Sequence, residues 1–264
     1  MLKITGLTKV FNPGTINEKI ALDQVDLHLR PGDFVSVIGG NGAGKSTLLN
    51  CVAGVYRQEA GSILLDGQRL DRLPEHKRAK HLGRVFQDPL MGTAADMEIQ
   101  ENLALAARRG GFRGLSWGVT ASEKAEFHTR LAALGLGLEE RMSVKVRLLS
   151  GGQRQALTLL MAILKTPKLL LLDEHTAALD PKTARAVLAL SDRFISDLGL
   201  TCMMVTHNMR DAIAYGNRLI MMSQGRIILD VNGEDKRQLT VEQLIHLFSS
   251  RSGEQVNNDR MLLG

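Results

Sequence analysis

The chain has 264 residues, of which 44% are hydrophobic and 23% charged, so it can form one large domain or a domain with a subdomain. Its net charge of +5 suits anionic ligands or a membrane face as well as an ordinary solvated surface. Only 4% of its residues are aromatic, which argues against a nucleic-acid surface built on base stacking.

The two cysteines, Cys51 and Cys202, each lie inside an apolar segment. We expect buried thiols in a reducing compartment rather than a disulfide or a metal site. The first residues lack the apolar core of a signal peptide, and no run approaches the roughly 18 apolar residues that span a bilayer. We therefore expect a soluble protein whose membrane role depends on a partner.

In the first half of the chain, apolar patterns predict a series of short elements. The predicted strands cover residues 2–7, 20–29, 34–38 and 61–67, and the predicted helices follow at 48–53, 74–80, 97–108 and 120–136. A basic, glycine-rich linker at 108–117 contains the only tryptophan, Trp117. It could contact nucleic acid, but a solvated loop with one packed anchor is the interpretation that we favour.

In the second half, short apolar strands alternate with helices. After a helix that starts near residue 150, strands are predicted at 169–172 and 201–206, a helix at 182–198, a hairpin at 218–229, and a terminal helix from 240 with a frayed polar end near 250–264. Continuous apolar strands separated by helices imply a parallel sheet covered on both faces. In such sheets the loops at the carboxyl ends of the strands build the functional site.

A phosphate-binding P-loop follows the strand at 34–38 and precedes a helix. Its residues are Gly39, Gly40, Asn41, Gly42, Ala43, Gly44, Lys45, Ser46 and Thr47. The glycines let consecutive backbone N–H groups face a phosphate, and the helix N-terminus adds a positive dipole end. Lys45 is expected to reach the β- and γ-phosphates, and the Ser46 hydroxyl to hold Mg²⁺.

A pair of carboxylates ends the apolar strand at 169–172. Asp173 stands where a Mg²⁺-binding carboxylate is expected, and Glu174 is placed to orient and polarise the attacking water. Two weaker candidates also follow apolar strands. The imidazole of His207 can sense the γ-phosphate, although a lone histidine is more often structural, and the amide of Gln87 can contact Mg²⁺ or the water.

A second phosphate-binding element occurs about a hundred residues after the P-loop. Ser150, Gly151, Gly152 and Gln153 open a predicted helix, so their backbone N–H groups can face an anion. Two interpretations are open at this point. One chain binds two phosphates, or the second element serves the nucleotide of a neighbouring subunit.

The order of the P-loop, Gln87, the Leu-Ser-Gly-Gly-Gln segment, Asp173-Glu174, Asp180 and His207 resembles the ATP-binding subunits of ATP-binding cassette (ABC) transporters over residues 1–248. The resemblance implies ATP and Mg²⁺ as cofactors and a head-to-tail homodimer that sandwiches ATP between one P-loop and the partner's segment 150–153. It also implies that Phe11 stacks on adenine, Gln87 couples to a helical subdomain and binds Mg²⁺, Asp180 lies in a loop that crosses the dimer, and His207 is a switch residue.

The same resemblance implies an α/β fold with a RecA-like parallel core at 1–87 and 149–248, an N-terminal antiparallel β subdomain, an inserted helical subdomain at 88–148 and a polar tail at 249–264. The sequence departs from the family pattern at three places. His175 replaces a common proline, Ala156 and Met161 stand where many relatives carry arginine, and Phe11 replaces a common tyrosine.

Four segments, at residues 11–15, 39–41, 74–78 and 173–178, are similar to a bacterial subgroup of tryptophan- or tyrosine-type amino-acid import ATPases that work with an extracytoplasmic binding protein. We therefore expect an ATPase at the cytoplasmic face of a membrane, bound to permease subunits and not to nucleic acid. The alternative is a soluble cassette ATPase in ribosome, DNA-repair or iron–sulfur work. The chain has one set of motifs and no heptad insertion, which argues against the double-cassette and coiled-coil types. The transported solute does not follow from the sequence.

Overall fold

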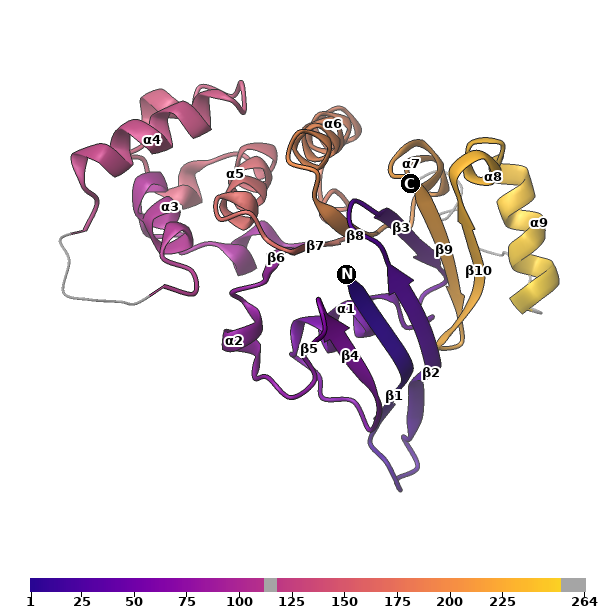
Figure 1. Ribbon diagram of the computed structural model, residues 1–264. Helices are drawn as coiled ribbons and strands as arrows, with labels where there is room; N and C mark the ends of the chain where they lie inside the picture. Colours follow the sequence, from indigo (N-terminus) through magenta and orange to yellow (C-terminus); the bar gives the residue numbers. More distant parts are fainter. Residues whose placement is uncertain (112–117, 253–264) are drawn as a thin grey trace. The chain divides into compact units, whose positions relative to one another are not determined.

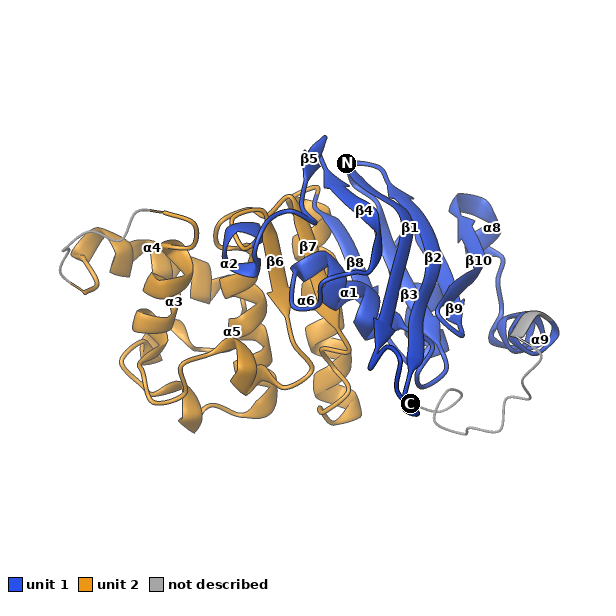
Figure 2. Cartoon of the chain, turned by 90° about the horizontal axis from the view of Figure 1, so that it is seen from below, with its two compact units in different colours: residues 1–78, 200–264 blue, residues 79–199 orange. Residues whose placement is uncertain are grey.

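The computed structural model describes residues 1–111 and 118–252, in two compact units (Figures 1 and 2). Unit 1 contains residues 1–78 and those from 200 onward, and unit 2 contains residues 79–199. Residues 112–117 of the predicted linker, including Trp117, and the tail beyond 252 lie outside the described residues. Within the described residues, no helix is long and apolar enough to cross a membrane.

Unit 1 contains an antiparallel sheet with the strand order β2-β1-β4-β5. Its strands are β1 (Leu2–Phe11), β2 (Lys19–Leu29), β4 (Ala60–Leu65) and β5 (Gln68–Arg69). Buried and exposed residues alternate at the start of β1, as expected for a sheet with one covered face. This sheet confirms the predicted antiparallel β subdomain and carries Phe11 at the end of β1.

The other strands of unit 1 follow the order β10-β9-β3-β8. They are β3 (Phe34–Gly39), β8 (Thr201–Val205), β9 (Arg218–Ser223) and β10 (Arg226–Asn232). β3 is parallel to β8 and β9, and every residue of β3 and β8 is buried. The helices of the unit are α1 (Lys45–Ala53), α2 (Glu75–Arg78), α7 (Met209–Ala214), α8 (Gly233–Arg237) and α9 (Val241–Ser252).

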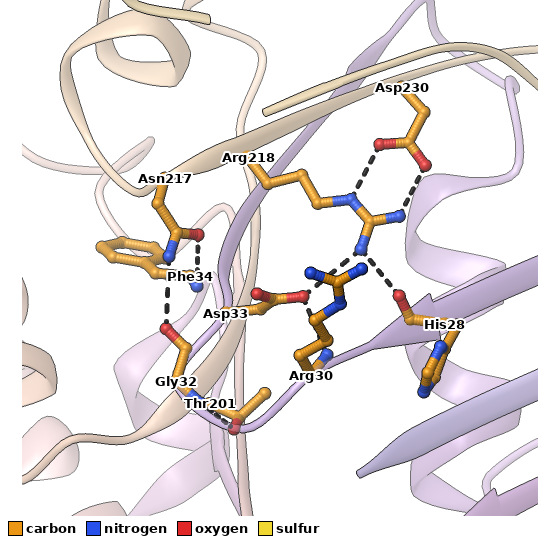
Figure 3. A network of polar contacts seen from close by, with 9 residues as sticks. All are labelled: His28, Arg30, Gly32, Asp33, Phe34, Thr201, Asn217, Arg218 and Asp230. Carbon is orange, nitrogen blue, oxygen red and sulfur yellow. Dashed lines mark hydrogen bonds and ion pairs between the residues drawn. The ribbon is translucent and has the colours of Figure 1, made fainter. Parts of the chain in front are cut away.

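A polar network joins the amino ends of β3, β8 and β9 (Figure 3). The guanidinium of Arg218 donates to both oxygens of Asp230, at 2.7 and 2.6 Å, and to the carbonyl oxygen of His28 at 2.6 Å. Its Nη1 also lies 3.3 Å from an Asp33 carboxylate oxygen. These bonds fix the turn that leads into β3 and leave the opposite, carboxyl edge of the strands to the P-loop.

Unit 2 contains the parallel pair β6 (Leu82–Val85) and β7 (Leu169–Asp173). Its helices are α3 (Ile99–Ala107), α4 (Ala121–Ala132), α5 (Gly151–Ile163) and α6 (Pro181–Asp197), with short 3₁₀ helices at Pro89–Gly92, Glu139–Arg141 and Val146–Leu148. One buried cluster joins α3, α4 and α5 around Leu103, Phe127 and Leu157. This core holds the N-terminus of α5 in a defined place.

Most predicted elements are present, with shifted ends. Helix α4 ends at Ala132 and not at 136, because Gly135 and Gly137 have positive φ angles of 68° and 66° and the chain turns there. The short helices α7 and α8 were not predicted, since five or six residues give too little periodicity to detect. Both cysteines are buried and free, as expected.

Candidate functional site

The P-loop connects β3 to α1 in unit 1. The side chain of Lys45 is buried, with 6% of its surface exposed, and its ammonium donates to the carbonyl oxygens of Gly39 at 2.8 Å and Gly40 at 3.0 Å. These bonds fold the lysine back along the loop, so its charge lies beside the backbone that would surround a phosphate. Ser46 is exposed at the first turn of α1.

The loop glycines are required by backbone conformation and by space. Gly42 and Gly44 have φ angles of 78° and 101°, which L side chains rarely adopt. A Cβ on Gly44 would lie 2.5 Å from the carbonyl oxygen of Ala21. The β9–β10 turn supports the loop from the other side, because the Gly225 N–H donates to the Ala43 carbonyl at 3.0 Å. The loop is therefore held in one shape by neighbouring backbone.

Phe11, the predicted adenine-stacking residue, lies at the end of β1. Its ring meets Tyr56 edge-on at 5.2 Å between centroids, and the Lys9 ammonium lies 5.2 Å from its centroid. The ring is partly exposed. A partly exposed aromatic face held by an edge contact has the geometry that stacking on a planar base needs.

His207 lies at the same edge of the strands as the P-loop. β3 and β8 run parallel with Val37 opposite Val205, and the Thr206 N–H donates to the Val37 carbonyl at 3.1 Å. His207, two residues after the end of β8, therefore lies close to the level at which β3 leads into the P-loop. The pKa of Asp211 on α7 is raised by burial, and its electrostatic interaction with His207 opposes that rise.

In unit 2, Gln87, Asp173 and Glu174 follow the carboxyl ends of two paired parallel strands. Val85 lies opposite Leu172, so the residues that come next share one edge. Arg84 of β6 reaches this edge too, with its Nη2 3.7 Å from an Asp173 carboxylate oxygen and its guanidinium carbon 4.4 Å from the Phe86 ring centroid. Arg84 was not among the predicted site residues.

Glu174 has a positive φ of 45°, in the left-handed region. The next residue, His175, is 2% exposed, and its Nε2 lies 3.0 Å from the Ser191 hydroxyl oxygen on α6. Burial lowers the pKa of His175 to about 4, so the ring is neutral near pH 7. The sequence identified His175 only as a departure from the family pattern.

Ser150 caps the N-terminus of α5. Its hydroxyl oxygen accepts from the Gln153 N–H at 3.3 Å, and the Gln153 side-chain oxygen accepts from the Ser150 N–H at 3.2 Å. In this capping box the Ser150 hydroxyl acts as an acceptor, so its hydrogen can still be donated to an anion. Further along α5, the buried Gln155 amide donates to the Phe86 carbonyl at 3.2 Å, which connects this helix to the residue before Gln87.

Asp180 caps α6 in the same way. Its carboxylate accepts from the Thr183 N–H at 3.1 Å, and hydrogen bonds from the side chain and the backbone of Thr183 hold the pKa of Asp180 below its usual value. A cleft of about 710 Å³ lies beside the N-termini of α5 and α6 in unit 2. Ser150, Gly152, Gln153, Lys182 and Thr183 line its polar part.

The predicted site residues thus fall into two groups. In unit 1, Phe11, the P-loop and His207 lie at the carboxyl ends of β1, β3 and β8. In unit 2, Gln87, Asp173 and Glu174 lie at the carboxyl ends of β6 and β7. Ser150 and Asp180, also in unit 2, lie at the N-termini of α5 and α6. Arg84 and Gln155 were not among the predicted site residues. No local sequence pattern marks them, because their contacts are with residues far away in the chain.

Several known proteins are similar to this chain. The model of the ABC transporter family matches residues 22–177. A tyrosine transport ATP-binding protein of Clostridioides difficile is 44% identical over 94% of this chain and 98% of that protein. A methionine import ATP-binding protein of Streptomyces avermitilis is 35% identical over 86% of this chain, and this match spans 65% of that longer protein.

Solved structures of ABC transporter cassettes are also similar to this chain. A bacterial ABC transporter cassette with a dimeric structure has a TM-score of 0.75 and 28% identity, over 88% of this chain and 98% of that one. A dimeric cassette in a post-hydrolysis state, bound to ADP and phosphate, has a TM-score of 0.74 and 27% identity, with the same coverage. These findings confirm the predicted α/β cassette fold.

Proposed function

Because this chain belongs to the ABC transporter family of ATP-binding, ATP-hydrolysing proteins, we propose that it powers a membrane importer, with an amino acid as the transported solute. Support for the solute class comes from two relatives, one named for tyrosine transport and another for methionine import. The observation that carries the proposal is the presence of two separate helix N-termini that can each bind phosphate, one at Lys45 and one at Ser150.

Two copies of the chain form a head-to-tail dimer in this proposal. ATP bound by the P-loop of one copy is covered by residues 150–153 of the other. The free hydrogen of the Ser150 hydroxyl and the N–H groups at the start of α5 provide donors for that second side. Asp180 contributes to the crossing loop, and Phe11 stacks on the adenine.

The donors proposed for Mg²⁺ are the Ser46 hydroxyl, the Gln87 amide oxygen and the Asp173 carboxylate. These are hard oxygen donors of the kind that Mg²⁺ prefers. In the described part of the chain no three His, Cys, Asp or Glu residues gather as a metal site, which fits an ion that takes its other ligands from phosphate and water. When bound, Mg²⁺ neutralises charge that develops on the phosphates.

The protein's own groups then carry out hydrolysis. Lys45 binds the phosphate oxygens, and Glu174 acts as the base that orients and polarises the attacking water and accepts its proton. His207 follows the loss of the γ-phosphate, and Gln87 couples the site to the helical segment at 88–148, which we propose as a subdomain of an ABC domain that ends near 248. In unit 2, Gln155 supports this coupling through its bond to Phe86.

A permease is the partner that would convert these changes into transport, with the chain held at the cytoplasmic face of the membrane and a binding protein on the other side. The 3₁₀ helix after Gln87 offers a docking surface in unit 2. Leu90 and Met91 are 45% and 71% exposed there, and neighbouring exposed apolar side chains provide a surface on which a partner can pack. Nucleic acid has no place in this proposal.

Replacing Glu174 by glutamine tests the mechanism. We expect ATP binding to persist, hydrolysis to fall about 100-fold or more, and a dimer with trapped ATP to accumulate, because the amide cannot accept the water's proton. Glu126→Gln, at an exposed residue of α4 whose carboxylate lies 3.6 Å from Arg130, is the matched control. Unchanged hydrolysis in purified Glu174→Gln protein would refute the assignment of Glu174.

A further inference from the structure

The turn after β7 contains a buried imidazole that the proposed mechanism does not use. His175 directly follows Glu174, and its Nε2 lies 3.0 Å from the Ser191 hydroxyl oxygen in the middle of α6. Both side chains are almost fully buried, with exposed fractions of 2% and 1%. A polar contact so well shielded from water is strong only if donor and acceptor match.

The direction of this hydrogen bond follows from the neighbouring contact. The Ser191 hydroxyl has a single hydrogen, and it is donated to the Val187 carbonyl oxygen at 2.9 Å. The Ser191 oxygen must therefore accept from the imidazole, so Nε2 carries the hydrogen. The Nε2–H of His175 thus donates to the Ser191 hydroxyl oxygen, and this hydrogen bond connects the turn after β7 to α6.

The residue before this anchor has a strained backbone. Glu174 has a φ of 45°, which costs a non-glycine residue roughly 1–2 kcal/mol. Its carbonyl accepts from the Ala177 N–H at 3.0 Å, which closes a turn that spans His175. Such a conformation persists only where surrounding contacts impose it. The next residue, His175, is fixed by its buried contact with Ser191.

We propose that His175, anchored to Ser191, is a positioning residue that holds the backbone of Glu174 in its left-handed conformation and so aims the Glu174 carboxylate at the attacking water. The inference rests on the proposed role of Glu174. His175 itself does not touch the nucleotide, and its effect is exerted through its neighbour. Loss of the anchor allows the turn to relax and the carboxylate to swing away.

Four variants of the full-length chain test this role. His175→Leu keeps an apolar group in the buried space but lacks the donor, and we expect single-turnover hydrolysis to fall about 10- to 100-fold while ATP affinity changes less than about threefold. His175→Gln carries an N–H donor of similar reach and should restore most of the rate. Ser191→Ala should lower the rate as His175→Leu does. Ser196→Ala, at an exposed serine of α6, should change nothing.

A double variant separates positioning from general destabilisation. Since His175 acts through Glu174, adding His175→Leu to Glu174→Gln should cause no further loss of rate. The same fractional loss in both backgrounds would overturn the inference. An unchanged rate in His175→Leu, or rate and ATP affinity falling together in all variants, would also overturn it.

The two proposals fail in different ways. If Glu174→Gln retains hydrolysis, the role of Glu174 is wrong. If Glu174→Gln abolishes hydrolysis but His175→Leu and Ser191→Ala do not slow it, only the positioning role is wrong. Should His175→Leu fail to fold, Ser191→Ala decides the question, because it leaves the ring in place and removes the hydroxyl that accepts from it.

Discussion

The guanidinium of Arg78 donates to the carbonyl oxygen of Cys51 at 2.7 Å, and the same nitrogen lies 3.0 Å from the carbonyl oxygen of Val52. Both carbonyls belong to the last turn of α1, the helix that begins at the P-loop. A buried positive charge thus neutralises the negative end of the helix whose positive end faces the phosphate. A third bond, to Leu73 at 2.8 Å, fixes the guanidinium.

Replacing Arg78 by methionine should destabilise the protein by about 2–4 kcal/mol, because hydrogen bonds from a charged donor to buried carbonyls are lost. The midpoint of urea unfolding, measured without nucleotide, checks this value. Arg72→Met is the control, since Arg72 is exposed in the same segment and should shift stability by less than about 0.5 kcal/mol. Equal effects of the two substitutions would contradict the role of Arg78.

Gly44→Ala should weaken ATP binding at least about tenfold, because the added Cβ forces the loop away from the Ala21 carbonyl and strains a φ of 101°. Equilibrium titration with a fluorescent ATP analogue measures the affinity. Gly67→Ala is the matched control, since Gly67 also has a positive φ, of 77°, but no atom lies within 4 Å of an added Cβ. Retention of full affinity by Gly44→Ala would show that the loop shape is not required.

Much of this site could be predicted because its signals are local. The P-loop, Asp173-Glu174 and Ser150–Gln153 are short runs in which glycine, a charge and an apolar strand occur at fixed spacing. Parallel pairing then brings the ends of strands to a common edge without further information. The assigned roles of Gln87, Asp180 and His207 rest on family resemblance and stay predictions.

The contacts that hold the site could not be predicted, because they join residues far apart in the chain. Arg78 meets the end of α1 across 26–27 positions, and Gln155 meets Phe86 across 69. The contact between His175 and Ser191 spans 16 positions and depends on how a turn packs on α6. No periodicity or composition signals such contacts; they require the packed structure.

Stability at high pH should depend on Cys51. Burial raises the pKa of the Cys51 thiol from 9.0 to about 11. Between these values the unfolded chain loses the thiol proton and the folded chain keeps it, so the free energy of unfolding falls as pH rises from 9 to 11, by about 2 kcal/mol from this group.

Urea unfolding of the wild type and Cys51→Ala across this range checks the prediction. The wild type should lose about 2 kcal/mol more than the variant between pH 9 and 11, even though the variant starts from a lower stability. The comparison of slopes removes the contribution of other groups that titrate there. Parallel curves would show that the thiol is not responsible.

The central claim is that each ATP is shared between the P-loop of one copy and residues 150–153 of another. Mixing inactive Lys45→Ala subunits with inactive Ser150→Arg subunits measures this directly, because a mixed dimer has one composite site with both faces intact. We predict that hydrolysis, absent in either variant alone, returns in the mixture in proportion to the mixed dimers. Complete absence of hydrolysis in demonstrated mixed dimers would contradict the claim.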